Sequence, residues 1–411
     1  MALRVFYGCG VDLSVQDAAT VHVTQVVANL RALGCHVDLH APVPRTPQVA
    51  PQAHYFPQRP RNPLWQLRHD LDLARTILAG GKRGKWDVAY VRTMSLSFLV
   101  PVACRLTGLP MVAEVNGFAH AELLSAGASA PKRLLCDLAE RLCYRLSARV
   151  VCVSDRLRSL VLARFRAPSQ KVVTIHNGTD LSVFHPLDRK VARRRVGLPE
   201  DRLIVGFLGS FYLHHGVDLL VRAAGAVVAA DPSVLFVLAG DGPTRPSVRE
   251  LVVRNGLSER VLMPGRVPIT SAPDWISSFD VAVHCFRGAT AGCPIKVLDY
   301  MACGRPVVAG RDLEAADMIE TAGAGVAVDP SNTSELSGTL SWLLHDSARR
   351  EEMGQRGRAL VEGSFSWRQT AEKIDEVLRA VVLEARGHPP RRPRRQRIRA
   401  PLAAQRRQGT A

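Results

Sequence analysis

The chain is organised around one stretch, Ala291-Gly-Cys-Pro-Ile-Lys-Val-Leu-Asp-Tyr-Met-Ala-Cys-Gly-Arg-Pro-Val-Val308. Its pattern predicts a loop, a helix, a glycine stop and the start of a buried strand. Cys293 stands at the N-cap position, and Pro294 suits the first helical position because the N–H that proline lacks is unpaired there anyway. Gly304 suits the left-handed backbone that ends many helices.

The start of this predicted helix has the chemistry of an anion site. Backbone N–H groups at a helix N-terminus bind anions, and Lys296 adds a full positive charge. Asp299 follows three residues later and lies on about the same face of the helix. This order favours a ligand with phosphates at one end and hydroxyls further along, such as a nucleotide sugar. An ordinary amphipathic helix with Ile295, Leu298 and Met301 in the core is the alternative, and the spacing alone leaves both open.

Length and composition describe an ordinary globular protein with more than one core. The chain has 411 residues, which predicts two domains. No run of about 20 apolar residues occurs, so no transmembrane helix is expected, and the first residues lack a signal-peptide pattern. The nine cysteines include no Cys-x-x-Cys pair. They are typical of buried thiols, which favours a cytoplasmic location and neither a zinc site nor disulfides.

The positive charge is concentrated at the C-terminal end. The formal net charge is +17, and nine arginines but no acidic residue lie between residues 386 and 411. This segment is rich in proline, arginine and glutamine without apolar periodicity, which predicts a disordered tail. Peripheral contact with an anionic membrane surface, at its inner face, through Arg386–Arg407 is one interpretation. A neutral extension is the favoured one, and a nucleic-acid partner is not expected.

Strands and helices alternate twice along the chain. Apolar strands are expected at residues 4–7, 37–40, 87–91, 110–115, 149–153 and 172–175, and again at 203–208, 234–239, 261–263, 280–285, 306–309 and 325–328. Helices are expected between them, including 20–33, 65–78, 96–106 and 130–146. The alternation predicts an α/β fold with two doubly wound, Rossmann-like parallel sheets. Ligands bind such sheets at the carboxyl ends of the strands, so a cleft between the two units is the expected site.

Other segments fix the boundaries. Residues 41–63 are rich in proline and predict a long surface loop, and Asp70-Leu-Asp72 is interpreted as a solvated helix face rather than a metal site. Because the alternation breaks between residues 180 and 201, a domain boundary is placed there. The expected units are residues 1–190, residues 191–365, a closing helix at 366–385 and the tail at 386–411.

Five motifs occur in a characteristic order. They are Asn177-Gly-Thr-Asp180, Gly209-Ser-Phe211 with His215-Gly216, Gly240-Asp-Gly-Pro243, Gly265-Arg-Val267 and Pro294–Val308. Together with the two predicted sheets, they resemble the retaining GT-B glycosyltransferases of family 4 (glycosyl transferases group 1). The resemblance covers residues 3–385. It implies a GT-B fold and transfer of a sugar from a nucleoside diphosphate sugar to an acceptor hydroxyl, with no metal and no cofactor beyond the donor.

The resemblance also implies roles for individual residues. The C-terminal unit would bind the donor through Gly209, Ser210, His214, Gly216, Gly242, Arg266, Val267, Cys293, Pro294, Ile295, Val297 and Asp299. The N-terminal unit would bind an acceptor through Glu114, Glu122 and Arg92. Lys296, Asn116 and His215 are the candidate catalytic residues.

The chain departs from the family pattern at several of these positions. The family usually has two glutamates eight residues apart, whereas this chain has Ala291 and Asp299. The family's phosphate-loop arginine and lysine fall at Ser210 and His215, and its first-domain histidine falls at Asn116. The resemblance then implies that Lys296, with His214 or His215 when protonated, holds the phosphates.

The family mechanism needs no protein base. The acceptor hydroxyl attacks from the side of the departing diphosphate, whose own oxygen takes the proton. A sugar-nucleotide epimerase of the same fold is an alternative function. A catalytically weak partner subunit that binds anionic surfaces through its basic tail is another.

Overall fold

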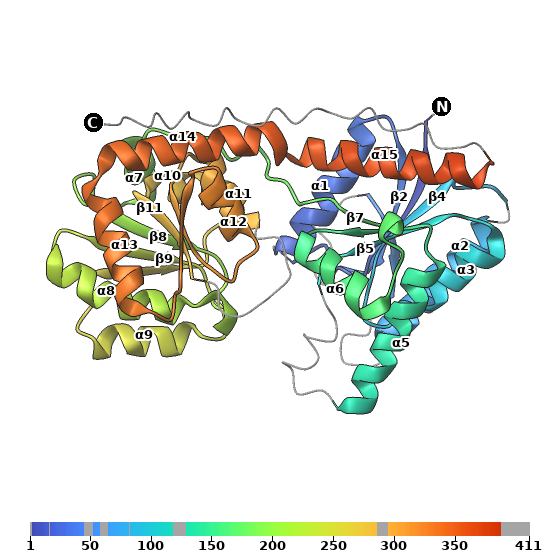
Figure 1. Ribbon diagram of the computed structural model, residues 1–411, viewed down its shortest axis with the longest axis horizontal. Coiled ribbons are helices and arrows are strands. Elements are labelled where there is room, and N and C mark those ends of the chain that lie inside the picture. Colours follow the sequence, from blue (N-terminus) through green and yellow to red (C-terminus); the bar gives the residue numbers. More distant parts are fainter. Residues whose placement is uncertain are drawn as a thin grey trace, which may run out of the picture.

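The computed structural model describes residues 2–15, 17–44, 52–57, 65–81, 83–117, 129–285 and 295–387. Two α/β units lie side by side (Figure 1). The expected fold class is confirmed: each unit is a parallel sheet covered by helices. Four positions or segments discussed above lie outside the described residues: Ala291, Glu122, the pair Cys293 and Pro294, and the chain beyond 387.

The first unit contains a seven-stranded parallel sheet of order β3-β2-β1-β4-β5-β6-β7. Its strands are β1 (Arg4–Gly8), β2 (His36–Pro42), β3 (His54–Phe56), β4 (Val88–Arg92), β5 (Met111–Val115), β6 (Arg149–Cys152) and β7 (Val172–Thr174). Its helices are α1 (Ala18–Ala32), α2 (Trp65–Gly81), α3 (Leu99–Thr107), α5 (Ala130–Leu146) and α6 (Asp155–Phe165). The strand β3 corrects the loop expected over 41–63, because three of those residues pair with the edge of β2.

The second unit contains a six-stranded parallel sheet of order β10-β9-β8-β11-β12-β13. Its strands are β8 (Ile204–Leu208), β9 (Leu235–Ala239), β10 (Val261–Gly265), β11 (Val281–His284), β12 (Val307–Gly310) and β13 (Gly325–Val328). Its helices are α7 (Arg189–Val196), α8 (Val217–Ala230), α9 (Arg245–Arg254), α10 (Ala272–Ser278), α11 (Ile295–Ala302), α12 (Ala315–Thr321), α13 (Thr333–His345) and α14 (Ser347–Ser364). The strand order reverses beside β8, and such a switch point opens a crevice at the carboxyl ends of the strands.

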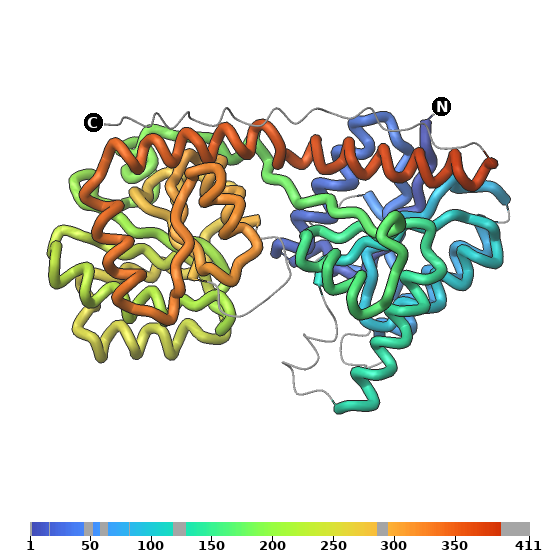
Figure 2. Tube along the Cα trace, viewed as in Figure 1, coloured from blue at the N-terminus to red at the C-terminus, as the bar shows by residue number. Residues whose placement is uncertain are grey.

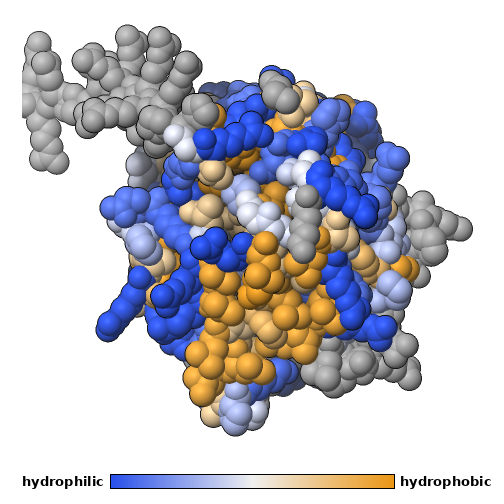
Figure 3. Space-filling view, turned by 90° about the vertical axis from the view of Figure 1, so that its right-hand side faces the viewer, coloured by the Kyte–Doolittle hydropathy of each residue, from blue (hydrophilic) through white to orange (hydrophobic). Residues whose placement is uncertain are grey.

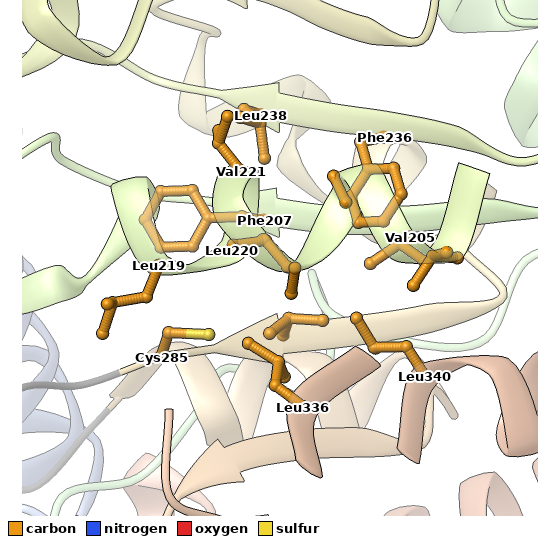
Figure 4. Close-up of a cluster of buried hydrophobic side chains, with 14 of the residues drawn as sticks. Val205, Phe207, Leu219, Leu220, Val221, Phe236, Leu238, Cys285, Leu336 and Leu340 are labelled. Carbon is orange, nitrogen blue, oxygen red and sulfur yellow. The ribbon is translucent and has the colours of Figure 1, made fainter. Parts of the chain in front are cut away.

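Each sheet has an apolar cluster on both faces. In the second unit, Phe207 and Leu238 from the strands meet Leu220 of α8 and Leu340 of α13 in one cluster (Figure 4). Neighbouring strand residues such as Ile204 face the opposite cluster, which contains α10 and α11. Burial of each such large side chain contributes about 1.5–3 kcal/mol, so both faces of the sheet are held by helices.

Helix α8 is the one described segment apolar and long enough to raise the question of a membrane span. The stretch Leu213–Ala230 passes a test of length and composition, but half of it is buried inside the protein. It packs against α13 and faces the core of the second unit. A buried core helix passes the same test, so the stretch is weak evidence for a span.

The last helix returns to the first unit. Helix α15 (Trp367–Ala385) follows α14, and the two run along one side of both units (Figure 2). Ser366 and Gln369 form a capping box at its start. Trp367 and Leu378 are buried in the first unit's core, where α15 packs against α1. The helix therefore ties the two units together.

One aspartate of the α2 pair differs from expectation. Asp70 is fully buried rather than solvated. Its Oδ2 accepts hydrogen bonds from the N–H groups of Phe98 (3.0 Å) and Leu99 (2.7 Å), and so caps the start of α3. Burial raises the pKa of Asp70 to about 6. Helix spacing alone gave no sign of this contact, because α3 lies on a different segment of the chain.

Candidate functional site

In the second unit, the turns that follow the central strands pack so closely that their backbones leave no room for a side chain at two glycines. At Gly240, where φ is 139°, an added Cβ would lie 1.8 Å from the carbonyl oxygen of Gly209. At Gly216, where φ is 62°, it would lie 1.8 Å from the carbonyl oxygen of Cys285. No side chain fits at either position. The turns after β8, β9 and β11 are thereby brought to one point.

The side chain of Lys296 lies where these turns meet. It is the second residue of α11, and its Cε would lie 2.3 Å from a Cβ added at Gly209. Burial lowers the pKa of the Lys296 ammonium to about 8, and the nearby Asp299 carboxyl partly opposes the shift. Within the described ranges, no carboxylate forms an ion pair with Lys296. The ammonium is therefore a poorly compensated charge, which favours an anionic ligand.

His215, beside Lys296, is neutral near pH 7. His215 Nδ1 contacts the carbonyl oxygen of Ser210, which leaves Nε2 facing Lys296 Nζ at 3.3 Å. Burial, and then the Lys296 charge, lower the pKa of His215 to about 3. Partial desolvation, and then the Lys296 charge, also lower the pKa of the more exposed His214. This opposes the expectation that a protonated histidine supplies a phosphate cation, and leaves Lys296 as the cation of the group.

Asp299 is engaged with the first unit. Its Oδ1 accepts a hydrogen bond of 2.5 Å from Thr179 Oγ1. Burial raises the pKa of the Asp299 carboxyl to about 7, although the Thr179 bond and Lys296 lower it. The sequence singled out the Asn-Gly-Thr-Asp motif but gave no role to Thr179. Ribose binding by Asp299 stays a prediction.

In the first unit, Glu114 is the centre of a buried polar group at the end of β5. It is completely buried, and its Oε1 lies 2.7 Å from His22 Nε2 and 3.5 Å from Arg92 Nη1. The Asn116 amide also donates to it. Burial would raise the pKa of Glu114, but His22 and Arg92 outweigh burial and lower it to about 2. The sheet edge therefore holds a fixed carboxylate among donors.

His22 of α1 is a buried part of this group. Its Nδ1 lies 2.8 Å from Asn177 Oδ1, and its ring packs edge-to-face with Trp367. It therefore links Glu114 to the motif that ends the first sheet. The signal that could have found it is position: His22 lies in the early part of α1, which begins beside the carboxyl end of β1.

A second contact between the units joins two helix starts. Glu314, just before α12, accepts hydrogen bonds from the N–H groups of Asp155 (2.6 Å) and Arg156 (3.3 Å) at the start of α6. His176 Nε2 lies 3.6 Å from the carboxylates of both Asp155 and Glu314. A carboxylate at a helix N-terminus is favourable. The contact therefore joins the segment after β6 in the first unit to the segment after β12 in the second.

The remaining predicted donor residues occupy different environments. Arg266 and Val267 follow β10, and Gly242 follows β9. Val297 is buried in the core, so only its backbone can face a ligand. Ile295 packs against the core cluster of the first unit. Glu122, Cys293 and Pro294 lie outside the described residues.

Comparison with known proteins agrees with this architecture. Residues 19–183 match a family model described as Glycosyltransferase Family 4, and residues 202–346 match one described as Glycosyl transferases group 1. An alpha-D-kanosaminyltransferase from Streptomyces kanamyceticus is 27% identical over 329 residues, 78% of this chain and 82% of the relative. D-inositol 3-phosphate glycosyltransferase 1 from Catenulispora acidiphila is 26% identical over 318 residues, 74% of this chain and 75% of the relative.

Solved structures share the fold over nearly the whole chain. A sucrose-phosphate synthase from Thermosynechococcus elongatus aligns with a TM-score of 0.74 and 19% identity, over 92% of this chain and 98% of its own. HepE from Anabaena, solved in complex with UDP, aligns with a TM-score of 0.75 and 16% identity, over 92% of this chain and 100% of its own. The two family models match one region in each unit, and the solved structures share the fold of both units. The chain therefore belongs to the GT-B glycosyltransferases of family 4 (glycosyl transferases group 1).

Proposed function

We propose that this glycosyltransferase takes a sugar from a nucleoside diphosphate sugar and passes it to an acceptor hydroxyl with retention of anomeric configuration. The observation that carries the proposal is the ammonium of Lys296. It is held against the glycine turn after β8, and none of the described carboxylates forms an ion pair with it. A diphosphate is the anion that suits this position best, because the first N–H groups of α11 face the same end.

The leaving group is stabilised by charge rather than by a base. As the bond between the sugar and the diphosphate breaks, negative charge grows on the diphosphate, and Lys296 with the α11 amides stabilises that charge. The acceptor hydroxyl attacks from the same side and gives its proton to the departing diphosphate oxygen. Asn116 is an amide, and Glu114 has a pKa of about 2 and is already bound by donors. An amide and a carboxylate of low pKa are both weak proton acceptors, so Asn116 and Glu114 suit binding better than proton abstraction.

The acceptor would bind at the carboxyl edge of the first sheet. Arg92 and Asn116 stand beside Glu114 there, and together they offer donors and a fixed carboxylate to hydroxyl groups. The relatives named above act on different substrates according to their names, so no particular donor sugar or acceptor is assigned. The UDP complex of HepE makes UDP-sugars the first donors to test.

No divalent metal is expected to be required, because Lys296 and the helix amides supply the positive potential that a metal supplies elsewhere. The test is incubation with UDP-, GDP-, dTDP- and ADP-sugars, each with and without EDTA, followed by measurement of free nucleoside diphosphate. Slow release from one donor that EDTA leaves unchanged supports the proposal, and the anomeric configuration of the product tests retention. Interconversion of the donor sugar without release would indicate an epimerase. Failure to turn over any donor would favour a partner subunit.

A further inference from the structure

Helix α5 exposes a row of leucines although its opposite side is already packed. Cys136, Ala139 and Cys143 face the core. On the outer side, Leu134, Leu135 and Leu138 are 60%, 53% and 55% exposed. A surface helix normally has one apolar stripe, which faces its own protein. The second stripe on α5 therefore has no partner within the described part of the chain.

The stripe continues onto the neighbouring helix. Residues 134, 138 and 142 follow one another at helical spacing, and Leu142 is 36% exposed. Helix α3 packs beside α5, and its Leu106 is 69% exposed. We call these residues the leucine face: Leu106, Leu134, Leu135, Leu138 and Leu142. Figure 3 looks onto this end of the molecule and shows a broad apolar patch between hydrophilic borders. Such patches mark interaction sites.

The border of the leucine face is cationic. The exposed side chains of Lys132, Arg141 and Arg145 on α5, and of Arg105 on α3, form no ion pair with any described residue. The two acids of α5 do not offset them, because Asp137 pairs with Arg164 and Glu140 is buried. An apolar stripe between lysine and arginine side chains that no described carboxylate neutralises complements an anionic bilayer. The leucines enter the acyl boundary, and the long cationic side chains reach the headgroup phosphates.

We propose that the leucine face of α3 and α5 docks this protein on a bilayer surface that contains anionic lipids. Each cation near such a surface adds electrostatic attraction to the lipid headgroups. A second copy of the chain fits less well, because a symmetric contact would bring two cationic borders together. The surface is distinct from the basic tail considered above.

The location of the face gives it a use. In a parallel β-α-β unit the helix begins at the carboxyl edge of the sheet, so α5 begins on the same edge as Glu114 and Asn116 at the end of β5. If the function proposed above holds, an acceptor carried by a lipid would arrive beside the first sheet. The docking itself does not depend on that function.

Cosedimentation with vesicles tests the proposal. The full-length chain is mixed with phosphatidylcholine vesicles, or with equal parts of phosphatidylcholine and phosphatidylglycerol. It should bind only the second kind, and less at high salt. The double variant Leu134→Gln/Leu138→Gln should bind about tenfold more weakly or worse, with an unchanged melting temperature because both side chains are exposed. Val253→Gln on α9, where the side chain is 62% exposed, is the matched control and should bind normally.

A variant truncated after Gly387 tests the leucine face in the absence of the basic tail. It should still bind anionic vesicles, and the double variant in that background should not. Loss of all binding on truncation would overturn the proposal, as would double variants that bind like their parents. Light scattering completes the test, because a dimer that the leucine substitutions dissociate would identify a second copy as the occupant instead.

Discussion

Thr179 Oγ1 donates a hydrogen bond of 2.5 Å to Asp299 Oδ1. Thr179 follows β7 in the first unit, whereas Asp299 lies on α11 three residues after Lys296. One bond therefore couples the last motif of the first unit to the helix that carries the half-buried Lys296 cation. Because a carboxyl group with a pKa of about 7 accepts the bond, the coupling depends on pH.

The pKa of Asp299 predicts a pH-dependent stability difference. Because the folded-state pKa of about 7 lies above the ordinary value of 3.8, the folded chain keeps a proton that the unfolded chain has lost. The contribution of Asp299 to stability is complete below about pH 4 and is lost as the pH rises through 7. Asp299→Asn removes this titration, so its melting temperature relative to wild type should be higher at pH 8 than at pH 4.

Thermal unfolding at several pH values checks this. Asp201→Asn, at an exposed position, is the control for the change from aspartate to asparagine itself. A melting-temperature difference that stays constant across the pH range would show that Asp299 does not titrate as described.

Glu114 predicts the opposite dependence. Burial would raise its pKa, but His22 and Arg92 lower it to about 2, below the ordinary 4.5. Its contribution is therefore present above about pH 4.5 and is lost as the pH falls toward 2. Glu114→Gln leaves His22 and Arg92 without their buried carboxylate, and should lower the free energy of unfolding at pH 7 by about 3 kcal/mol.

Urea unfolding between pH 7 and pH 4 measures the loss, which should shrink at the acid end. Glu384→Gln is the control, because its pair with Arg149 is partly exposed and is worth at most about 1 kcal/mol. An equal loss at every pH would mean that Glu114 acts through packing alone.

Two glycines in the segment after β8 predict separable defects. In Gly209→Ala the new Cβ meets the flexible end of Lys296, which can move aside, so turnover should fall while the melting temperature changes little. In Gly216→Ala the new Cβ meets the backbone of Cys285 at a positive φ, so the fold itself should be destabilised. Gly225→Ala in α8 meets nothing and should be neutral or slightly stabilising. Equal melting temperatures for the first two variants would contradict this.

The sequence was enough to predict the fold class, because long apolar strands alternate with helices and each strand needs helices on both faces. It missed β3, since three residues at a sheet edge in a proline-rich stretch carry no periodic signal. It misplaced Asp70 because a capping contact joins distant segments. The second apolar face of α5 was hidden for a related reason: periodicity shows that a helix is amphipathic but not which of two stripes is packed.

The candidate site was predictable where local spacing defines it and not where topology does. Lys296 and the glycine turns lie in short motifs with recognisable chemistry. His22 and Asn177 are far apart in the sequence, and their contact at 2.8 Å exists only because α1 and the end of β7 meet at one sheet edge. The neutrality of His215 likewise follows from burial beside Lys296, and spacing does not show burial.

Lys296 carries the sharpest prediction. Because its ammonium is expected to stabilise the leaving diphosphate, Lys296→Ala should lower kcat by about 100-fold or more, near 3 kcal/mol. Its melting temperature should not fall, since the variant removes a desolvated charge. Lys373→Ala, at an exposed position on α15, is the matched control and should retain activity.

The pH dependence of kcat/KM tests whether the charge of Lys296 itself has this role. With a pKa of about 8 in the free protein, the ammonium loses its proton as the pH rises through 8. The wild-type kcat/KM should therefore decline above pH 8, whereas the residual kcat/KM of Lys296→Ala should show no decline there. Bound diphosphate favours the charged form, so the wild-type kcat should decline only at higher pH. Parallel profiles for the two proteins would assign the alkaline decline to another group and remove Lys296 from this role.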